Sequence, residues 1–160
     1  MGANLVINTP QGPASPEDAV ILGDGFYPDI DANAMRSELR IDDTVTHEQL
    51  VAAVEGAIIY VTGQLASWRA EQEEAGFASM AAVAPLGMVN QKNRLEMLYR
   101  RAVRFQASSE IWELHRDISA TTDGQSKATN DELSSDEYER QATIAIRQIY
   151  GVTQSAVELI

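Results

Sequence analysis

The most regular pattern of apolar positions lies in the middle third of the chain. Apolar side chains recur there at steps of three and four residues, which places them on one face of a helix: Leu50, Val54, Ala57, Val61, Leu65 and Trp68. Thr46 and Gln49 have the spacing of a capping box, and Gly76 suits the end of a helix. The pattern predicts one continuous helix from 46 to 76, a rod of roughly 45 Å.

Three further helices are predicted around this rod. A short helix over 32–40 follows Asp31, whose carboxylate suits the N-cap position. A second long helix spans about 90–118, and a last one spans about 135–150, ended by Gly151. Their expected buried positions are Leu95, Leu98, Tyr99, Ala102, Phe105, Trp112 and Ile118 in the first, and Tyr138, Ala142, Ala145, Ile146 and Ile149 in the second. The predicted fold class is all-α, a small helical bundle with two long helices.

The two ends of the chain lack this periodicity. Residues 1–27 contain frequent proline and glycine, which predicts a flexible N-terminal arm without a core of its own. Residues 28–151 form the predicted helical domain. Residues 152–160 are predicted to be an extended, apolar C-terminal segment, and the polar stretch 119–135 is predicted to be a long loop.

Two glycines stand inside the predicted central helix. Gly56 and Gly63 are seven residues apart and therefore lie on one face. Each glycine in a helix interior costs about 1 kcal/mol relative to alanine. We therefore expect these positions to permit close contact with another helix.

Composition narrows the classes of partner. The chain of 160 residues has 24 acidic and 12 basic side chains and a formal net charge of −12, which disfavours gripping nucleic acid or an anionic membrane surface. The acidity equally fits a role in solubility alone. There is no cysteine, which excludes disulfides and thiolate chemistry. The first residues do not have the pattern of a signal peptide, and the apolar stretch 57–61 is too short to span a membrane, so a soluble protein is expected.

The sequence does not complete any of the common motifs of a catalytic or metal site. His47 and His115 have no second histidine at metal-ligand spacing. The acidic stretch that starts at Asp29 resembles the opening of a calcium loop, but Ala34 stands where glycine is needed and Arg40 where glutamate is needed. Neither a phosphate-binding glycine loop nor a nucleophile elbow occurs. We therefore predict no catalytic residue, no metal, no cofactor and no enzymatic activity.

The second long helix carries a cluster of cations. Arg94, Arg100, Arg101 and Arg104 crowd its first half, in part at helical spacing. One interpretation is a solvated basic face. The other is a subunit–subunit contact, in which these arginines pair with an acidic face of a neighbouring copy.

Several short motifs, taken in order, resemble one known family. They are Phe26-Tyr27-Pro28-Asp29-Ile30-Asp31, Met35-Arg36, Leu39-Arg40, Thr44-Val45, Ala75-Gly76-Phe77, Tyr99-Arg100-Arg101-Ala102-Val103 and Asp136-Glu137. With the long helix and the polar loop between them, they resemble the phage head completion proteins, the GpL type of temperate contractile-tailed phages. The resemblance covers about 26–160.

The resemblance implies a head–tail adaptor. Such a protein would form a ring, expected to be twelvefold, beneath the portal protein at the virion neck. It would line the DNA channel without binding DNA specifically, and it would offer a surface to a tail terminator or another neck protein. The subunit would be made in the bacterial host cytoplasm and would have no membrane partner.

The C-terminal segment suggests how such an adaptor would dock. Its apolar residues suit addition as a strand to a portal element, a hypothesis that names Val152, Ala156, Val157, Leu159 and Ile160. The alternative function is a soluble helical interaction module or regulator that binds one partner through the connector 77–87 and the polar loop, without ring assembly.

Overall fold

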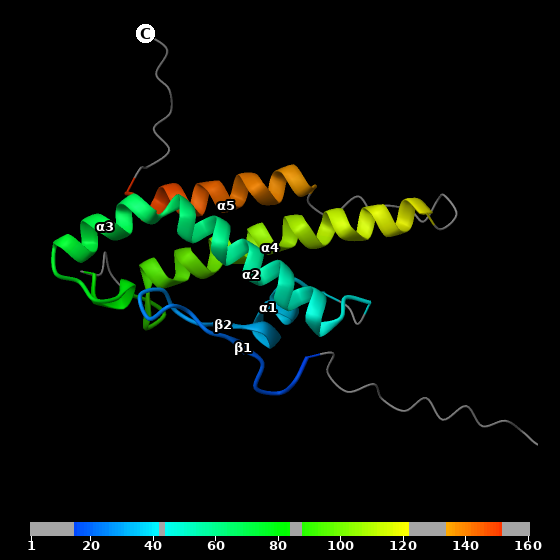
Figure 1. Ribbon diagram of the computed structural model, residues 1–160, viewed down its shortest axis with the longest axis horizontal. Coiled ribbons are helices and arrows are strands. Elements are labelled where there is room, and N and C mark those ends of the chain that lie inside the picture. Colours follow the sequence, from blue (N-terminus) through cyan, green and yellow to red (C-terminus); the bar gives the residue numbers. More distant parts are fainter. Residues whose placement is uncertain (1–14, 42–43, 84–87, 122–133, 152–160) are drawn as a thin grey trace, which may run out of the picture.

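The computed structural model describes residues 15–41, 44–83, 88–121 and 134–151, and within 115–121 it describes the backbone alone. Five α-helices account for most of these residues (Figure 1): α1 (Ala32–Glu38), α2 (His47–Gln64), α3 (Ala66–Glu74), α4 (Arg94–Thr121) and α5 (Ser135–Ile149). The remaining elements are a 3-10 turn η1 (Met80–Ala82) and four two-residue strands, β1 (Val20–Ile21), β2 (Ile30–Asp31), β3 (Met88–Val89) and β4 (Lys92–Asn93). The mostly helical prediction is confirmed, with two small antiparallel sheets that it did not include.

Helix α4 is the central helix, against which α2 and α5 pack. Helix α5 lies along one side of it and α2 crosses another (Figure 1). The α4 side chains in the core are Leu95, Tyr99, Ala102, Val103, Ala107 and Ile111, whereas Leu98, Phe105 and Trp112 are only half-buried. The predicted stripe on this helix is therefore correct at its start but rotated along its second half, because two packed helices cover a wider face than one.

The central rod is bent, which corrects the single helix predicted from 46 to 76. Helices α2 and α3 meet at Leu65 at an angle of 61°. The Thr62 hydroxyl donates to the carbonyl oxygens of Ile58 at 2.7 Å and Ile59 at 3.3 Å, a back-bonding pattern that bends helices. Among the described helices none alone has the length and apolar composition to cross a bilayer; α2 and α3 reach them only together, across this bend.

The end of the predicted N-terminal arm belongs to the folded core. Strand β1 pairs with β2, with Val20 opposite Asp31 and Ile21 opposite Ile30. Ser15, Phe26 and Tyr27 are buried. Described residues 15–27 are therefore packed on the helices, because aromatic side chains close the open end of the α2–α4 pair. Residues 1–14 of the predicted arm lie outside the described residues.

A buried arginine holds Ser15 against α1 and the residue before the α2 cap. Arg36 on α1 donates to the Val45 carbonyl at 3.0 Å and to the Ser15 hydroxyl at 3.4 Å. The same hydroxyl lies 3.1 Å from Nδ1 of His47 at the start of α2. His47 therefore contributes to packing the N-terminal segment against α1 and α2.

A β-hairpin precedes α4, which corrects the predicted helix start at 90. Asn90 and Gln91 adopt positive φ angles of 49° and 59° and connect β3 to β4. The side chain of Asn93 then accepts from the backbone amides of Leu95 at 2.8 Å and Glu96 at 3.3 Å. Because Asn93 caps the helix, α4 begins at Arg94.

The other predicted helix ends are confirmed. The Asp31 carboxylate accepts from the amides of Asn33 and Ala34, and Thr46 and Gln49 form the predicted capping box. Gly76 and Gly151 adopt positive φ angles of 95° and 74° just after α3 and α5. These local signals are strong because the unpaired amides and carbonyls of a helix end need a partner.

Replacing Thr46 with alanine should lower the free energy of unfolding by about 1 kcal/mol, because one half of the capping box is lost. Ser37→Ala is the matched control, since it removes an exposed hydroxyl from within α1, away from the cap of α2. Urea denaturation followed by circular dichroism would measure both. An equal loss in the two variants would contradict the capping role.

Candidate assembly surfaces

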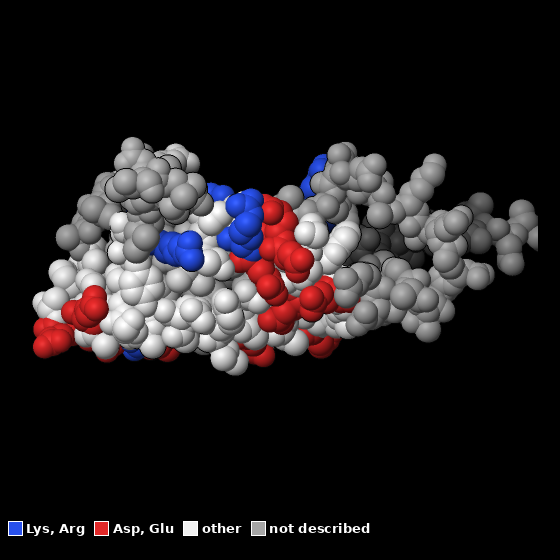
Figure 2. Space-filling model, turned by 90° about the horizontal axis from the view of Figure 1, so that it is seen from above, with Lys and Arg blue, Asp and Glu red and all other residues white. Residues whose placement is uncertain are grey.

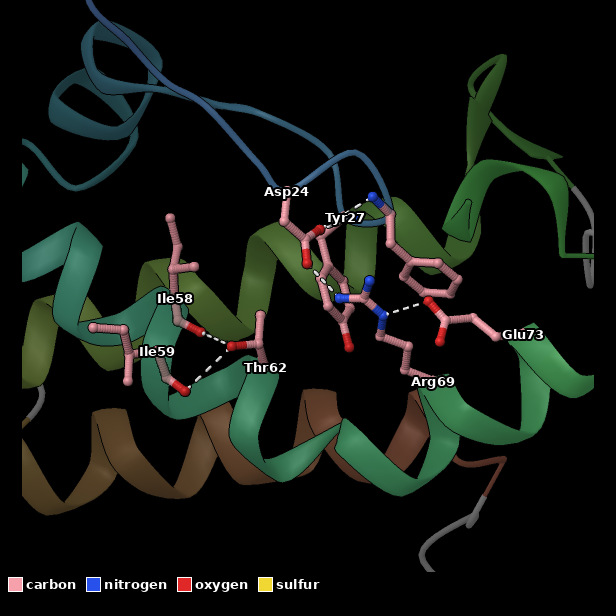
Figure 3. Close-up of polar contacts among 8 residues, drawn as sticks. Asp24, Tyr27, Ile58, Ile59, Thr62, Arg69 and Glu73 are labelled. Carbon is pink, nitrogen blue, oxygen red and sulfur yellow. Dashed lines mark hydrogen bonds and ion pairs between the residues drawn. The ribbon is translucent and has the colours of Figure 1, made fainter. Parts of the chain in front are cut away.

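The bend between α2 and α3 brings together an arginine, two carboxylates and two aromatic rings. Arg69 on α3 forms ion pairs with Asp24 and, at 2.8 Å, with Glu73. Its guanidinium lies 4.8 Å from the centre of the Phe26 ring and 5.5 Å from that of Tyr27. Figure 3 shows the guanidinium between the two carboxylates, beside the Tyr27 ring. Arg69 thereby ties α3 to the segment before β2.

Hydrogen bonds and burial shift the pKa values of three residues in this cluster. Burial acts to raise the pKa of Asp24, but hydrogen bonds from Arg69 and from the amides of Tyr27 and Phe26 outweigh it, so the net pKa lies below the ordinary 3.8. Hydrogen bonds to Glu73 and Asp24 raise the pKa of Arg69. Desolvation raises the pKa of Tyr27 to about 12, so its hydroxyl is neutral at physiological pH.

An open hollow lies between α2, α3 and the segment before β2. We call it the bend hollow; Asp24, Tyr27, Ile59, Gly63, Arg69 and Glu73 line it. Ile59 is 73% exposed, an unusual position for a large aliphatic side chain. The Tyr27 hydroxyl is buried and has no hydrogen-bond partner among the described residues, although its ring stacks on Tyr99 with centroids 4.9 Å apart.

The two helix glycines have different surroundings. A Cβ atom at Gly56 would lie 3.0 Å from a carboxylate oxygen of Glu110 on α4, so the expected close helix contact is present there. A Cβ atom at Gly63 would meet nothing within 4 Å. Gly63 therefore has no packing role among the described residues, although it keeps the cost of a helix glycine.

Arg100 and Arg104, two of the four arginines predicted to contact a neighbouring subunit, have partners within the chain. Arg104 forms an ion pair with Glu38 of α1 at 2.6 Å, and Arg100 lies 3.7 Å from Glu96. Arg101 is exposed, with its guanidinium 5.4 Å from the centre of the Phe105 ring, and Arg94 is exposed at the start of α4. The structure thus leaves Arg94 and Arg101 as the more accessible pair.

An acidic patch occupies the opposite part of α4, where α5 begins. Its residues are Glu110, Glu113, Asp136, Glu137 and Glu139. Figure 2 shows acidic side chains gathered in one area of this face, with much of the remaining described surface uncharged. The Ser135 hydroxyl joins the two helices by donating to Glu113 at 3.0 Å and by its 2.8 Å contact with the Ser109 hydroxyl.

Ionisation within the acidic patch is uneven. Desolvation, with a contribution from Glu113, raises the pKa of Glu110. Hydrogen bonds from Arg140 and Gln141 lower the pKa of Glu137 to about 2. Most of the patch is thus negatively charged at neutral pH, at the other end of α4 from Arg94.

The hairpin β3–β4 is a second exposed apolar feature that sequence reasoning missed. Met88 and Val89 are 58% and 51% exposed, next to exposed Lys92. The pair Asn90-Gln91, which connects the two strands, was the available signal. It was missed because these two residues were assigned to the start of the predicted helix. No acidic residue occurs between Glu74 and Glu96, so the hairpin is locally cationic.

The residues predicted to dock on a portal, Val152, Ala156, Val157, Leu159 and Ile160, lie outside the described residues. The described chain ends at Gly151, directly after Tyr150. The Tyr150 hydroxyl lies 2.9 Å from the Ser67 hydroxyl and donates to the Gln64 carbonyl at 2.8 Å. Tyr150 therefore ties the end of α5 to the α2–α3 bend.

These features define a class: a mostly helical protein with a few exposed apolar side chains and with charges gathered in separate areas. Within the described ranges, no three histidine, cysteine, aspartate or glutamate side chains are placed to hold a metal ion. The backbone of His115 lies within α4.

Comparison with known proteins gives the family. Residues 21–160 match the phage head completion protein (GPL) family, and the chain belongs to it. It is 28% identical over 156 residues to the head completion/stabilization protein of Escherichia phage P2, covering 98% of this chain and 89% of that protein. No solved structure shows significant similarity to it. The protein therefore has a structural role in the phage head.

Replacing Asp24 with asparagine should make stability less sensitive to acid. A carboxylate whose pKa is lower in the folded than in the unfolded state stabilises the fold above its unfolded pKa, and this stabilisation is lost as the pH falls. The free energy of unfolding, measured by urea denaturation between pH 5 and pH 3, should fall less steeply in Asp24→Asn than in the unmodified protein. Arg69→Met should flatten the profile in the same direction, and an unchanged profile in both would contradict the ion pair.

Replacing Gly63 with alanine should raise the free energy of unfolding of the isolated subunit by about 1 kcal/mol, because the new methyl group meets open space in a helix. Gly56→Ala is the matched comparison and should gain less, since its methyl group would press on Glu110. Thermal denaturation of both variants would measure the difference. Equal gains would contradict the different packing of the two glycines.

Proposed function

We propose that the protein is a head–tail adaptor that forms a ring of twelve copies beneath the portal protein at the virion neck. The observation that carries this proposal is the family match over 21–160, together with the P2 head completion/stabilization protein along nearly the whole chain. In this proposal, the head is completed at the vertex through which DNA passes, and the adaptor sits at that vertex.

The distribution of charge supports a ring. Cations gather at the first half of α4 and at the hairpin, whereas acids gather at the second half of α4 and at the start of α5. A closed ring needs a heterologous contact, in which two different faces of each subunit meet. Arg94, Arg100, Arg101 and Arg104 on one subunit face the acidic patch of the next in this proposal, with Arg94 and Arg101 free to turn outward.

The same charge supports passage of DNA. A formal net charge of −12 repels phosphate from most of the surface, whereas a cationic channel would retain it. A channel lined mainly by acidic and uncharged residues lets DNA move through the neck without specific binding. The outer end of the ring then provides the surface for a tail terminator or another neck protein.

Reconstruction of purified virus particles by electron cryomicroscopy tests the proposal. A ring of this protein directly beneath the portal, with the same symmetry, is expected. Particles in which the protein is absent from the neck, or present as one unpaired copy, would contradict it.

Loss of the C-terminal segment should abolish binding to the portal protein. We expect the apolar residues Val152, Ala156, Val157, Leu159 and Ile160 to dock as a strand, with main-chain hydrogen bonds that give affinity. Co-purification of tagged portal with a chain shortened by 152–160 would measure the loss. A full-length control with these five residues changed to serine should also fail to bind, and unchanged portal binding by the shortened chain would reject the docking role.

A further inference from the structure

We infer that the hairpin β3–β4 of one subunit seats in the bend hollow of a neighbouring copy of the same chain. This inference rests on the proposed ring and specifies one of its subunit contacts. Two exposed features that the described fold does not explain, the hairpin and the hollow, are each other's partners.

The apolar side chains on both surfaces fit such a contact. Ile59 in the hollow is 73% exposed, and Met88 and Val89 on the hairpin are more than half exposed. Burying such side chains gains about 25 cal/mol for each Å² of apolar area removed from water. An exposed apolar hairpin favours aggregation, and a specific partner that covers it prevents this.

Gly63 gives the hollow its open floor. A methyl group at this position would touch nothing in the described chain, yet alanine would suit the helix better. Absence of the side chain allows the backbone of an incoming segment to approach α2 closely. A hairpin tip is narrow enough to make that approach.

The charges of the two surfaces are complementary. In the hollow, Asp24 and Glu73 share the single guanidinium of Arg69, which leaves a net negative charge at the rim. The hairpin contributes Lys92 and is followed by Arg94, in a stretch without acidic residues. A second copy of this chain therefore brings the cation that the rim lacks.

The hollow also contains a hydroxyl group, that of Tyr27, without a hydrogen-bond partner among the described residues. The Tyr27 hydroxyl is buried without a hydrogen bond among the described residues, and leaving such a group unpaired costs about 1–3 kcal/mol. Its raised pKa keeps it a neutral donor. The side-chain amides of Asn90 and Gln91, at the tip of the hairpin, offer carbonyl oxygens as acceptors.

The contact has the asymmetry that a ring requires. The hairpin and the hollow are different surfaces, so one copy uses its hairpin on the next copy and offers its own hollow to the previous one. Repeating such a heterologous contact closes a ring when the rotation between copies divides a full turn.

Cross-linking within purified virus particles tests the inference, because the natural chain has no cysteine. Particles would be made with Ala66→Cys and Val89→Cys in one chain and treated with a short bismaleimide linker; Ala66 also lines the hollow, and Gly63 is left unchanged. Both positions are exposed, so the double variant should fold, and thermal denaturation of the purified subunit would check this. Denaturing electrophoresis should show a ladder of covalent oligomers larger than dimers.

Three controls make the result specific. Each single cysteine variant should give no ladder, because identical positions do not meet in a heterologous contact. A chain with Ala52→Cys and Val89→Cys, in which position 52 is exposed on α2 outside the hollow, should also give none. A ladder from the Ala52 variant as strong as from the Ala66 variant would overturn the proposed seating.

The outcomes separate this inference from the function on which it rests. A ring visible in the unmodified particles, together with only monomer bands from the Ala66 and Val89 double variant, overturns the hairpin contact and leaves the adaptor standing. Absence of any ring from the neck overturns the adaptor itself.

Discussion

The structure depends on the burial of one helix. Tyr99, Ala102 and Val103 of α4 are inaccessible to solvent because α2, α5 and the segment before β2 cover three sides of it. Stacking of Tyr27 on Tyr99 closes the third side. Because most apolar side chains are buried around α4, the surface carries charges in separate areas and a few exposed apolar side chains. Such features are suited to contact with other chains.

The bend at Leu65 follows from the same packing. A straight rod would carry Trp68 away from Phe26, whereas the bend places their ring centres 6.1 Å apart. Arg69 then reaches Asp24 and the two aromatic rings at once. The bend also places Ile59 and Gly63 in the hollow beside Arg69, so the stability of the fold and the formation of the hollow have a common origin.

Short sequence signals predicted the helix caps and helix ends, which depend on residues close together in the chain. Capping by Asp31 and Thr46 and the glycine ends at Gly76 and Gly151 were all predictable, because each involves residues within four positions of one another. The bend, the packing of 15–27 and the rotated second half of α4 were not, because they depend on contacts between distant segments. The hairpin before α4 was hidden by the helical pattern that follows it, and the Arg69 cluster joins residues 45 positions apart.

In the proposed assembly, each portal subunit is in contact with one copy of this chain. Native mass measurement of the portal complex purified from particles tests this claim most directly. The predicted mass corresponds to one copy of this chain for each portal subunit, released together rather than singly; a mass that corresponds to a lone copy, or to the portal alone, would contradict it.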